Sequence, residues 1–168
     1  MSMLRRLDHV AVLVRNTDDA LRYYRDRLGL EVCASEEIPT PHVRLTYLST
    51  GNAYVQLVEP LDSDGQLAAT LEEKGEGLHH ICFGVDDVAE AVASLNDDGT
   101  PVTLGSGRGR LSGFISTGDS HGVRIECTGF VHAEDVEGAP GWLSGRADQA
   151  EAEAEPKAQA EPAGVDSA

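Results

Sequence analysis

Two histidines, a glutamine and a glutamate stand at positions that a repeat in this chain relates to one another. A shift of 71 residues places His9 on His80, and a shift of 70 places Gln56 on Glu126. Each lies among apolar neighbours in a stretch expected to form a strand, where an unpaired polar side chain is costly to bury. Two imidazole nitrogens, an amide oxygen and a carboxylate oxygen suit a divalent metal ion, with Co²⁺ or Mn²⁺ favoured over Ni²⁺, Fe²⁺ or Zn²⁺.

Four protein ligands leave two positions of an octahedral ion open. Such an ion can act as a Lewis acid that holds two oxygens of one substrate. Taken alone, His9 is more often a hydrogen-bonded histidine than a ligand, and Gln56 alone carries no signal. Their repeat-related spacing favours the metal site.

The repeat also defines the elements that must position these side chains. LDHVAVLVRNTDDALRYYRDRLGLEV, from Leu7, aligns with LHHICFGVDDVAEAVASLNDDGTPV, from Leu78. In each copy an alternating strand is followed by an amphipathic helix, expected at 17–28 and 88–98, and then by three short strands. The strands are expected at 30–35, 43–49 and 52–59 in the first copy, and at 101–104, 113–117 and 123–128 in the second. The sequence therefore predicts an α+β fold in which two βαβββ modules form one open, curled mixed sheet.

These modules account for most of the chain as one domain. Module one is expected at about residues 4–62 and module two at about 76–132, which gives a domain over 4–132. The remainder, 133–168, is rich in Ala, Glu, Pro and Gly. We expect this acidic low-complexity tail to be mostly disordered.

The composition restricts partners and location. A net charge of -16 disfavours nucleic-acid binding through a basic face. The chain shows neither a long apolar run nor a signal-peptide core, so we expect a cytoplasmic protein without membrane insertion. Acid excess with only two lysines, Lys74 and Lys157, resembles proteins of halophilic archaea, with an ordinary acidic cytosolic protein as the alternative. Three widely spaced cysteines give no disulfide frame or zinc knuckle.

The adjacent histidines in GLHHICFGVDD have different expected roles. Neighbouring side chains of a strand point to opposite faces, so His79 and His80 are not expected to serve one site together. His80 aligns with His9 and is the expected ligand. His79 aligns with Asp8, which favours the outer face or a supporting hydrogen bond.

The segments LDHVAVLV, LHHICFGVDD, YVQLVEPL and GVRIECT resemble the vicinal oxygen chelate superfamily over about residues 4–132. That group includes glyoxalase I, extradiol dioxygenases, fosfomycin-resistance proteins and methylmalonyl-CoA epimerases. The order His, Gln, His, Glu is most similar to the epimerases, whereas glyoxalase I usually has a glutamate at the place of Gln56.

The resemblance implies exchange of the two configurations at C2 of methylmalonyl-CoA. The metal would chelate the thioester carbonyl and the carboxylate, and so stabilise the enolate that forms when the C2 proton leaves. Glu126 is carried over as metal ligand and proton carrier. The implied partners are a small acyl-CoA substrate and a second copy of the chain in a homodimer.

The sequence departs from the family at a second glutamate that some members are thought to use. The corresponding strand, HVRLTYL, contains no acid, and Leu45 falls near the expected position. Glu36 and Glu37 are nearby, although such a pair is more often solvated.

A glycine-rich loop and two other functions complete the expectations. The loop GSGRGRLSG, 105–113, is expected to be either an exposed hairpin or a flap whose Arg108 or Arg110 contacts CoA phosphates. The alternative functions are a glyoxalase I (lactoylglutathione lyase-type) isomerase and a non-catalytic small-molecule-binding relative. A ring-cleaving dioxygenase is disfavoured, because those enzymes use two histidines with one carboxylate.

Overall fold

Eight strands form a single mixed sheet in the computed structural model, which describes residues 3–107 and 110–129. The strand order is β2-β3-β4-β1-β5-β8-β7-β6. In chain order the elements are β1 (Leu4–Leu13), α1 (Thr17–Tyr24), β2 (Glu31–Pro39), β3 (His42–Ser49), β4 (Tyr54–Pro60), α2 (Gln66–Lys74), β5 (Gly77–Val85), α3 (Val88–Asp97), β6 (Val102–Gly107), β7 (Arg110–Ile115) and β8 (Ile125–Gly129). Of the helices in the described ranges, none is long and apolar enough to cross a membrane.

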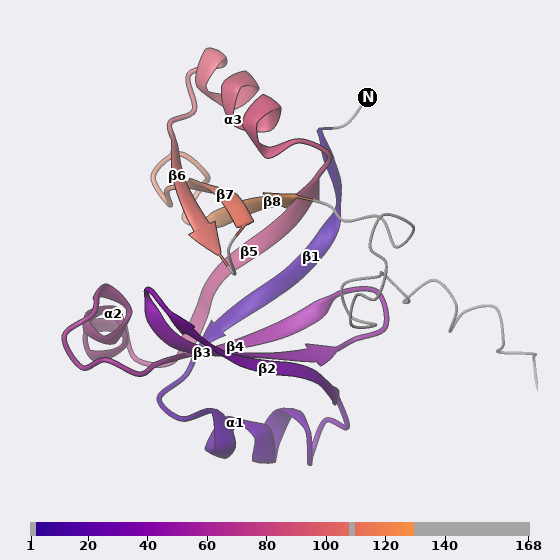
Figure 1. The fold of residues 1–168 in the computed structure, drawn as a ribbon, viewed down its shortest axis with the longest axis vertical. Helices are drawn as coiled ribbons and strands as arrows, with labels where there is room; N and C mark the ends of the chain where they lie inside the picture. Colours follow the sequence, from indigo (N-terminus) through magenta and orange to yellow (C-terminus); the bar gives the residue numbers. More distant parts are fainter. Residues whose placement is uncertain (1–2, 108–109, 130–168) are drawn as a thin grey trace, which may run out of the picture.

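The two halves of the sheet repeat one arrangement. β1 pairs in parallel with β4, β5 pairs in parallel with β8, and β1 and β5 join the halves as an antiparallel pair. The halves bend toward each other on one side of this central pair (Figure 1). The predicted α+β class, with two βαβββ units in an open mixed sheet, is confirmed.

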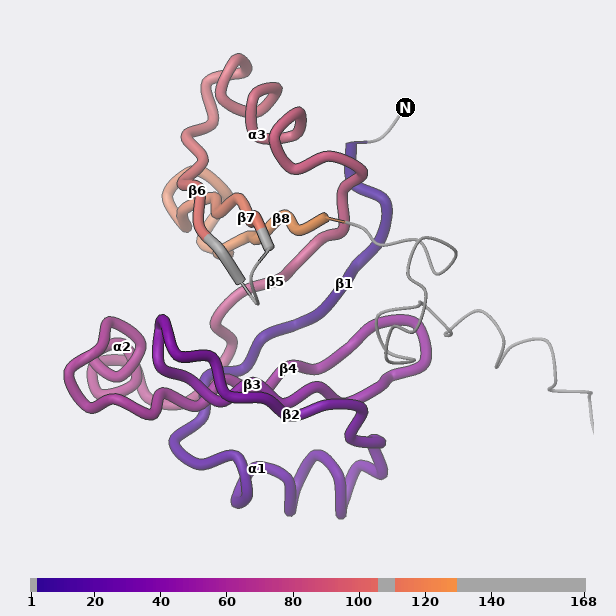
Figure 2. Tube along the Cα trace, in the orientation of Figure 1, coloured from indigo at the N-terminus to yellow at the C-terminus, as the bar shows by residue number. Residues whose placement is uncertain are grey.

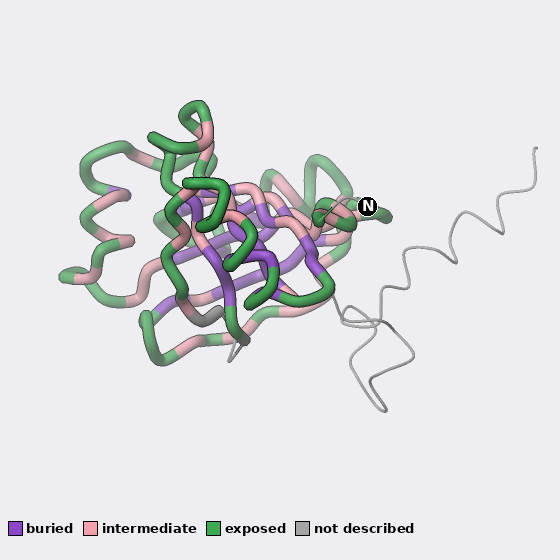
Figure 3. The backbone as a smooth tube through the Cα atoms, turned by 90° about the horizontal axis from the view of Figure 1, so that it is seen from above, coloured by how far each residue is buried: buried purple, intermediate pink, exposed green. Residues whose placement is uncertain are grey.

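One helix covers the outer face of each half. α1 and α3 lie on opposite outer sides of the curled sheet (Figure 2), and each begins at a side-chain cap. Asn16 accepts a hydrogen bond from the backbone of Asp19, and Asp87 accepts one from Glu90. These caps satisfy backbone N–H groups at the helix starts. Buried residues gather along the strands beneath the helices (Figure 3).

Three local features differ from the expected elements. The helix expected at 17–28 ends at Tyr24, where the backbone N–H groups of Asp26 and Leu28 bond to carbonyls five residues earlier and the chain leaves helical geometry. The strands expected at 101–104 and 113–117 extend further into the glycine-rich segment 105–113, which forms the hairpin of the two alternatives, and Gly105 pairs with Ser112. α2 lies between the modules, where the repeat offers no counterpart. The tail 133–168 lies outside the described residues.

Candidate metal centre

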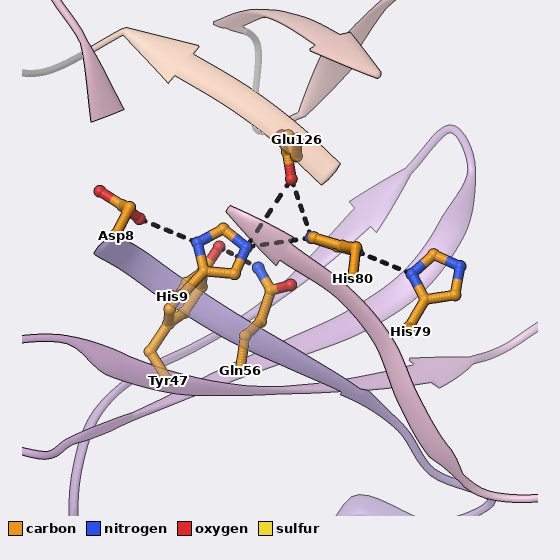
Figure 4. Close-up of polar contacts among 7 residues, drawn as sticks. All are labelled: Asp8, His9, Tyr47, Gln56, His79, His80 and Glu126. Carbon is orange, nitrogen blue, oxygen red and sulfur yellow. Dashed lines mark hydrogen bonds and ion pairs between the residues drawn. The ribbon is translucent and has the colours of Figure 1, made fainter. Parts of the chain in front are cut away.

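Three candidate donor atoms from three strands converge on the concave side of the sheet (Figure 4). The Nε2 atoms of His9 and His80 are 3.2 Å apart. The Oε2 atom of Glu126 lies 2.8 Å from Nε2 of His80 and 3.7 Å from Nε2 of His9. All three residues are at most 7% exposed. The fold thus brings together two nitrogens and one carboxylate oxygen that are far apart in the sequence.

Gln56 reaches the same place from β4. It is 5% exposed and lies directly opposite Tyr47 in the β3–β4 ladder. Its amide nitrogen donates a hydrogen bond to the Tyr47 hydroxyl, and its oxygen points away from that contact (Figure 4). The amide oxygen is therefore left as the atom that can bind a cation. Sequence reasoning missed Tyr47, because a tyrosine in an apolar strand is usually a core residue.

Each imidazole is supported through its other ring nitrogen. The carboxylate of Asp8 lies 2.8 Å from Nδ1 of His9, and Nδ1 of His79 lies 2.8 Å from Nδ1 of His80. A proton held on Nδ1 of each ligand histidine leaves the lone pair of Nε2 facing the centre. Asp8 and His79 occupy equivalent places in the repeat, so the support is repeated along with the ligands.

Two irregularities in the central strand pair explain how adjacent residues reach one site. Leu7 pairs with Phe83 and His9 with Cys82, so Asp8 is an extra residue on β1. In the same way, the register shift between the pairs Ala11–His80 and Val12–Leu78 makes His79 an extra residue on β5. Such bulges re-aim side chains. The expected outer-face position of His79 is wrong, and the supporting hydrogen bond is what the structure contains.

The electrostatics suit a cation. Burial lowers the pKa of His80 and lowers that of His79 to about 4, in the second case helped by His80 and Arg124. Burial acts to raise the pKa of Glu126, but the hydrogen bond with His80 and the two neighbouring imidazoles outweigh it, so the pKa is lowered. Near neutral pH His80 therefore offers a neutral nitrogen and Glu126 an ionised carboxylate, the protonation states that metal binding requires of these two groups.

A cavity of about 600 Å³ opens over this centre and is lined by both modules and by α2. Leu45 is buried and forms part of its apolar wall, whereas neither Glu36 nor Glu37 lines it. At another part of the lining, Nδ1 of His42 lies 2.7 Å from the carboxylate of Asp62. The cavity is large enough for a small acyl group with part of a longer carrier.

The side chains of the two arginines expected to contact substrate lie outside what the structure describes. Arg108 lies outside the described residues, and Arg110 is described only as the backbone partner of Gly107 in the β6–β7 hairpin. Arg124 lines the cavity instead. Its signal in the sequence was its place two residues before Glu126, which puts both side chains on one face of an extended chain.

Residues 8–115 match the Glyoxalase/Bleomycin resistance protein/Dioxygenase superfamily. The chain belongs to this superfamily.

Within the superfamily, the chain is similar to two proteins named as epimerases and to one uncharacterized protein. It is 33% identical over 137 residues to the ethylmalonyl-CoA/methylmalonyl-CoA epimerase of Cereibacter sphaeroides, covering 81% of this chain and 94% of the relative. It is 31% identical over 127 residues to the uncharacterized protein YqjC of Bacillus subtilis, covering 73% and 91%. A solved methylmalonyl-CoA epimerase in complex with methylmalonyl-CoA and NH4+ superposes with a TM-score of 0.67 at 32% identity, covering 75% of this chain and 94% of that one.

Proposed function

We propose that this superfamily member interconverts the two configurations at C2 of methylmalonyl-CoA in a metal-dependent reaction. The convergence of His9, His80 and Glu126 beneath one cavity carries the proposal. The activities for which its relatives are named supply the substrate class.

The donor set fits a divalent ion. His9, Gln56, His80 and Glu126 would hold it through two nitrogens and two oxygens, a set that suits Co²⁺ or Mn²⁺. When bound, the ion would supply Lewis-acid stabilisation of the negative charge that develops on the substrate as C2 loses its proton.

Glu126 is the residue we propose to carry the proton. Its carboxylate is ionised near neutral pH and lies in the centre, so it can accept a proton from a carbon held in the cavity. Asp8 and His79 hold the two imidazoles in orientation. The apolar side chains of Leu45 and Val58 on the cavity wall reduce the access of water, which strengthens the electrostatic interactions of the centre.

Hydrogen exchange at C2 tests the proposal. The protein is incubated with (2R)-methylmalonyl-CoA and Co²⁺ in D₂O, at low and high salt, and the product is followed by NMR and mass spectrometry. We expect deuterium at C2 and appearance of the second epimer, with both lost after chelation of the metal.

A second substrate separates the alternatives. The epimerase proposal fails if C2 gains no deuterium while methylglyoxal with a thiol is turned over, which is the result expected of a glyoxalase I-type isomerase. Binding of methylmalonyl-CoA without exchange of either kind would instead indicate a non-catalytic binding protein.

A further inference from the structure

Arg124 stands at the junction of two cavities. It lines the cavity over the candidate metal centre, and it also lines a second one of about 480 Å³. His79 and His80 line both cavities as well, so Arg124 lies beside the supported imidazole of the centre. Among the arginines and lysines whose side chains the structure describes, a set that leaves out Arg108 and Arg110, it is the only one that lines the larger cavity.

The guanidinium of Arg124 is held toward the site by an aromatic ring. Its central carbon lies 5.0 Å from the centroid of the Phe114 ring, and that ring in turn meets the His80 ring edge to face, with centroids 6.2 Å apart. Cation–π contact of this kind stabilises a guanidinium without using its N–H donors. The donors remain available for a ligand.

No carboxylate of the described chain neutralises this cation. Other arginines have carboxylates within 4.0 Å, namely Arg5, Arg15, Arg22, Arg25 and Arg44. Among the residues that the structure describes, none forms such an ion pair with Arg124. In a chain of net charge -16, an arginine that faces a cavity without an acidic partner points to an anionic ligand.

We propose that Arg124 binds the carboxylate of the substrate, through the oxygen that the metal ion would leave unbound, and makes the site specific for malonyl-type acyl groups. This inference rests on the proposed function. The carboxylate of methylmalonyl-CoA is attached to C2, so it must lie next to the proton carrier Glu126, which is two residues from Arg124 on the same face. A guanidinium fork matches a carboxylate in shape and charge.

Arg124→Leu tests this role, with Arg15→Leu as the matched control. Both substitutions remove one positive charge, but Arg15 pairs with Glu72 away from the cavity. We expect Arg124→Leu to raise KM for methylmalonyl-CoA by about 10- to 100-fold with little change in kcat, because the carboxylate is bound before and during the reaction. Arg124→Lys should give a smaller rise, and Arg15→Leu should leave KM unchanged.

A truncated substrate distinguishes the carboxylate from the phosphates of CoA. Methylmalonyl-pantetheine carries the first and lacks the second. We expect the same rise in KM for Arg124→Leu with this substrate. If the rise disappears, Arg124 binds phosphate and the proposal is overturned.

Binding of methylmalonate alone gives a readout that does not depend on turnover. Calorimetry on the metal-free protein should show about tenfold weaker binding to Arg124→Leu than to wild type or Arg15→Leu. Equal affinities would overturn the inference. If wild-type protein fails to exchange the C2 proton, the proposed function fails, whereas wild-type exchange with an unchanged KM in Arg124→Leu removes only the role of Arg124.

Discussion

At the scale of single residues, the orientation of the imidazoles matters as much as their presence. His9 and His80 could be predicted from the sequence because the repeat aligns them. Their supports could not, since the rule that adjacent strand residues face opposite sides fails at a bulge, and no pattern in the sequence marks Asp8 or His79 as bulged. The contact of Tyr47 could not be predicted for another reason. Only the β3–β4 register brings its hydroxyl to the amide of Gln56.

The difference between ligand and support predicts two levels of metal loss. His80→Ala removes a proposed donor atom and should abolish stoichiometric binding of Co²⁺. His79→Ala leaves all four donors and removes only the hydrogen bond to Nδ1 of His80. Loss of such support typically costs 10- to 100-fold in affinity, so binding of one ion should persist with a weaker Kd. Chelator competition measures both, and equal loss in the two variants would contradict the separate roles.

Glu126 has two proposed tasks that one substitution can separate. Glu126→Gln keeps an oxygen that can bind the ion but cannot carry a proton near neutral pH. We expect the variant to retain metal while the rate of deuterium entry at C2 falls by about 10²- to 10⁴-fold, the contribution typical of general acid–base groups. Metal content by mass spectrometry serves as the control. Exchange at the wild-type rate would assign the proton transfer to another residue.

At the scale of elements, the hydrophobic period predicted the helices and strands of both modules, but not their ends. Helix α2 was missed because the repeat, on which the assignment depended, has no copy of it. It matters for the site, since Gln66, Leu67 and Thr70 on this helix line the cavity. The strands of the β6–β7 hairpin are longer than the sequence predicted, because its glycines weaken a strand pattern that pairing with β8 stabilises.

One of those glycines permits the close approach of α3 to the sheet. A Cβ atom at Gly113 would lie 2.8 Å from Val92 on α3 and 3.0 Å from Val102 on β6. Gly113→Ala should therefore lower the free energy of unfolding by about 1–3 kcal/mol, the range for overpacking a core. Urea denaturation measures the change. Gly118→Ala is the control, because its nearest contact would be an ordinary 3.7 Å, and equal effects in both variants would exclude overpacking as the cause.

At the scale of the whole molecule, the candidate centre joins the two modules. His9 and Gln56 come from the first βαβββ unit, and His80 and Glu126 come from the second. The internal repeat made this arrangement predictable, because two related units packed about the β1–β5 pair must bring equivalent positions together. Arg124 breaks the symmetry: the equivalent position in the first module, by the shift of 70, is Tyr54. Because aligning the two copies reveals only positions that they share, the alignment could not identify Arg124 as a site residue.

A metal ion held from both modules should stabilise the folded chain, which gives a prediction for thermal unfolding. An ion that binds only the native state adds about 2.7 kcal/mol when its free concentration is 100 times Kd. The midpoint of unfolding should therefore rise with added Co²⁺ and return to its starting value with chelator, as followed by circular dichroism. His80→Ala should show no rise, because it lacks a donor from the second module. A rise of equal size in that variant would mean that the stabilisation comes from ions bound to the acidic surface of the protein. Binding at the candidate centre would then not be its cause.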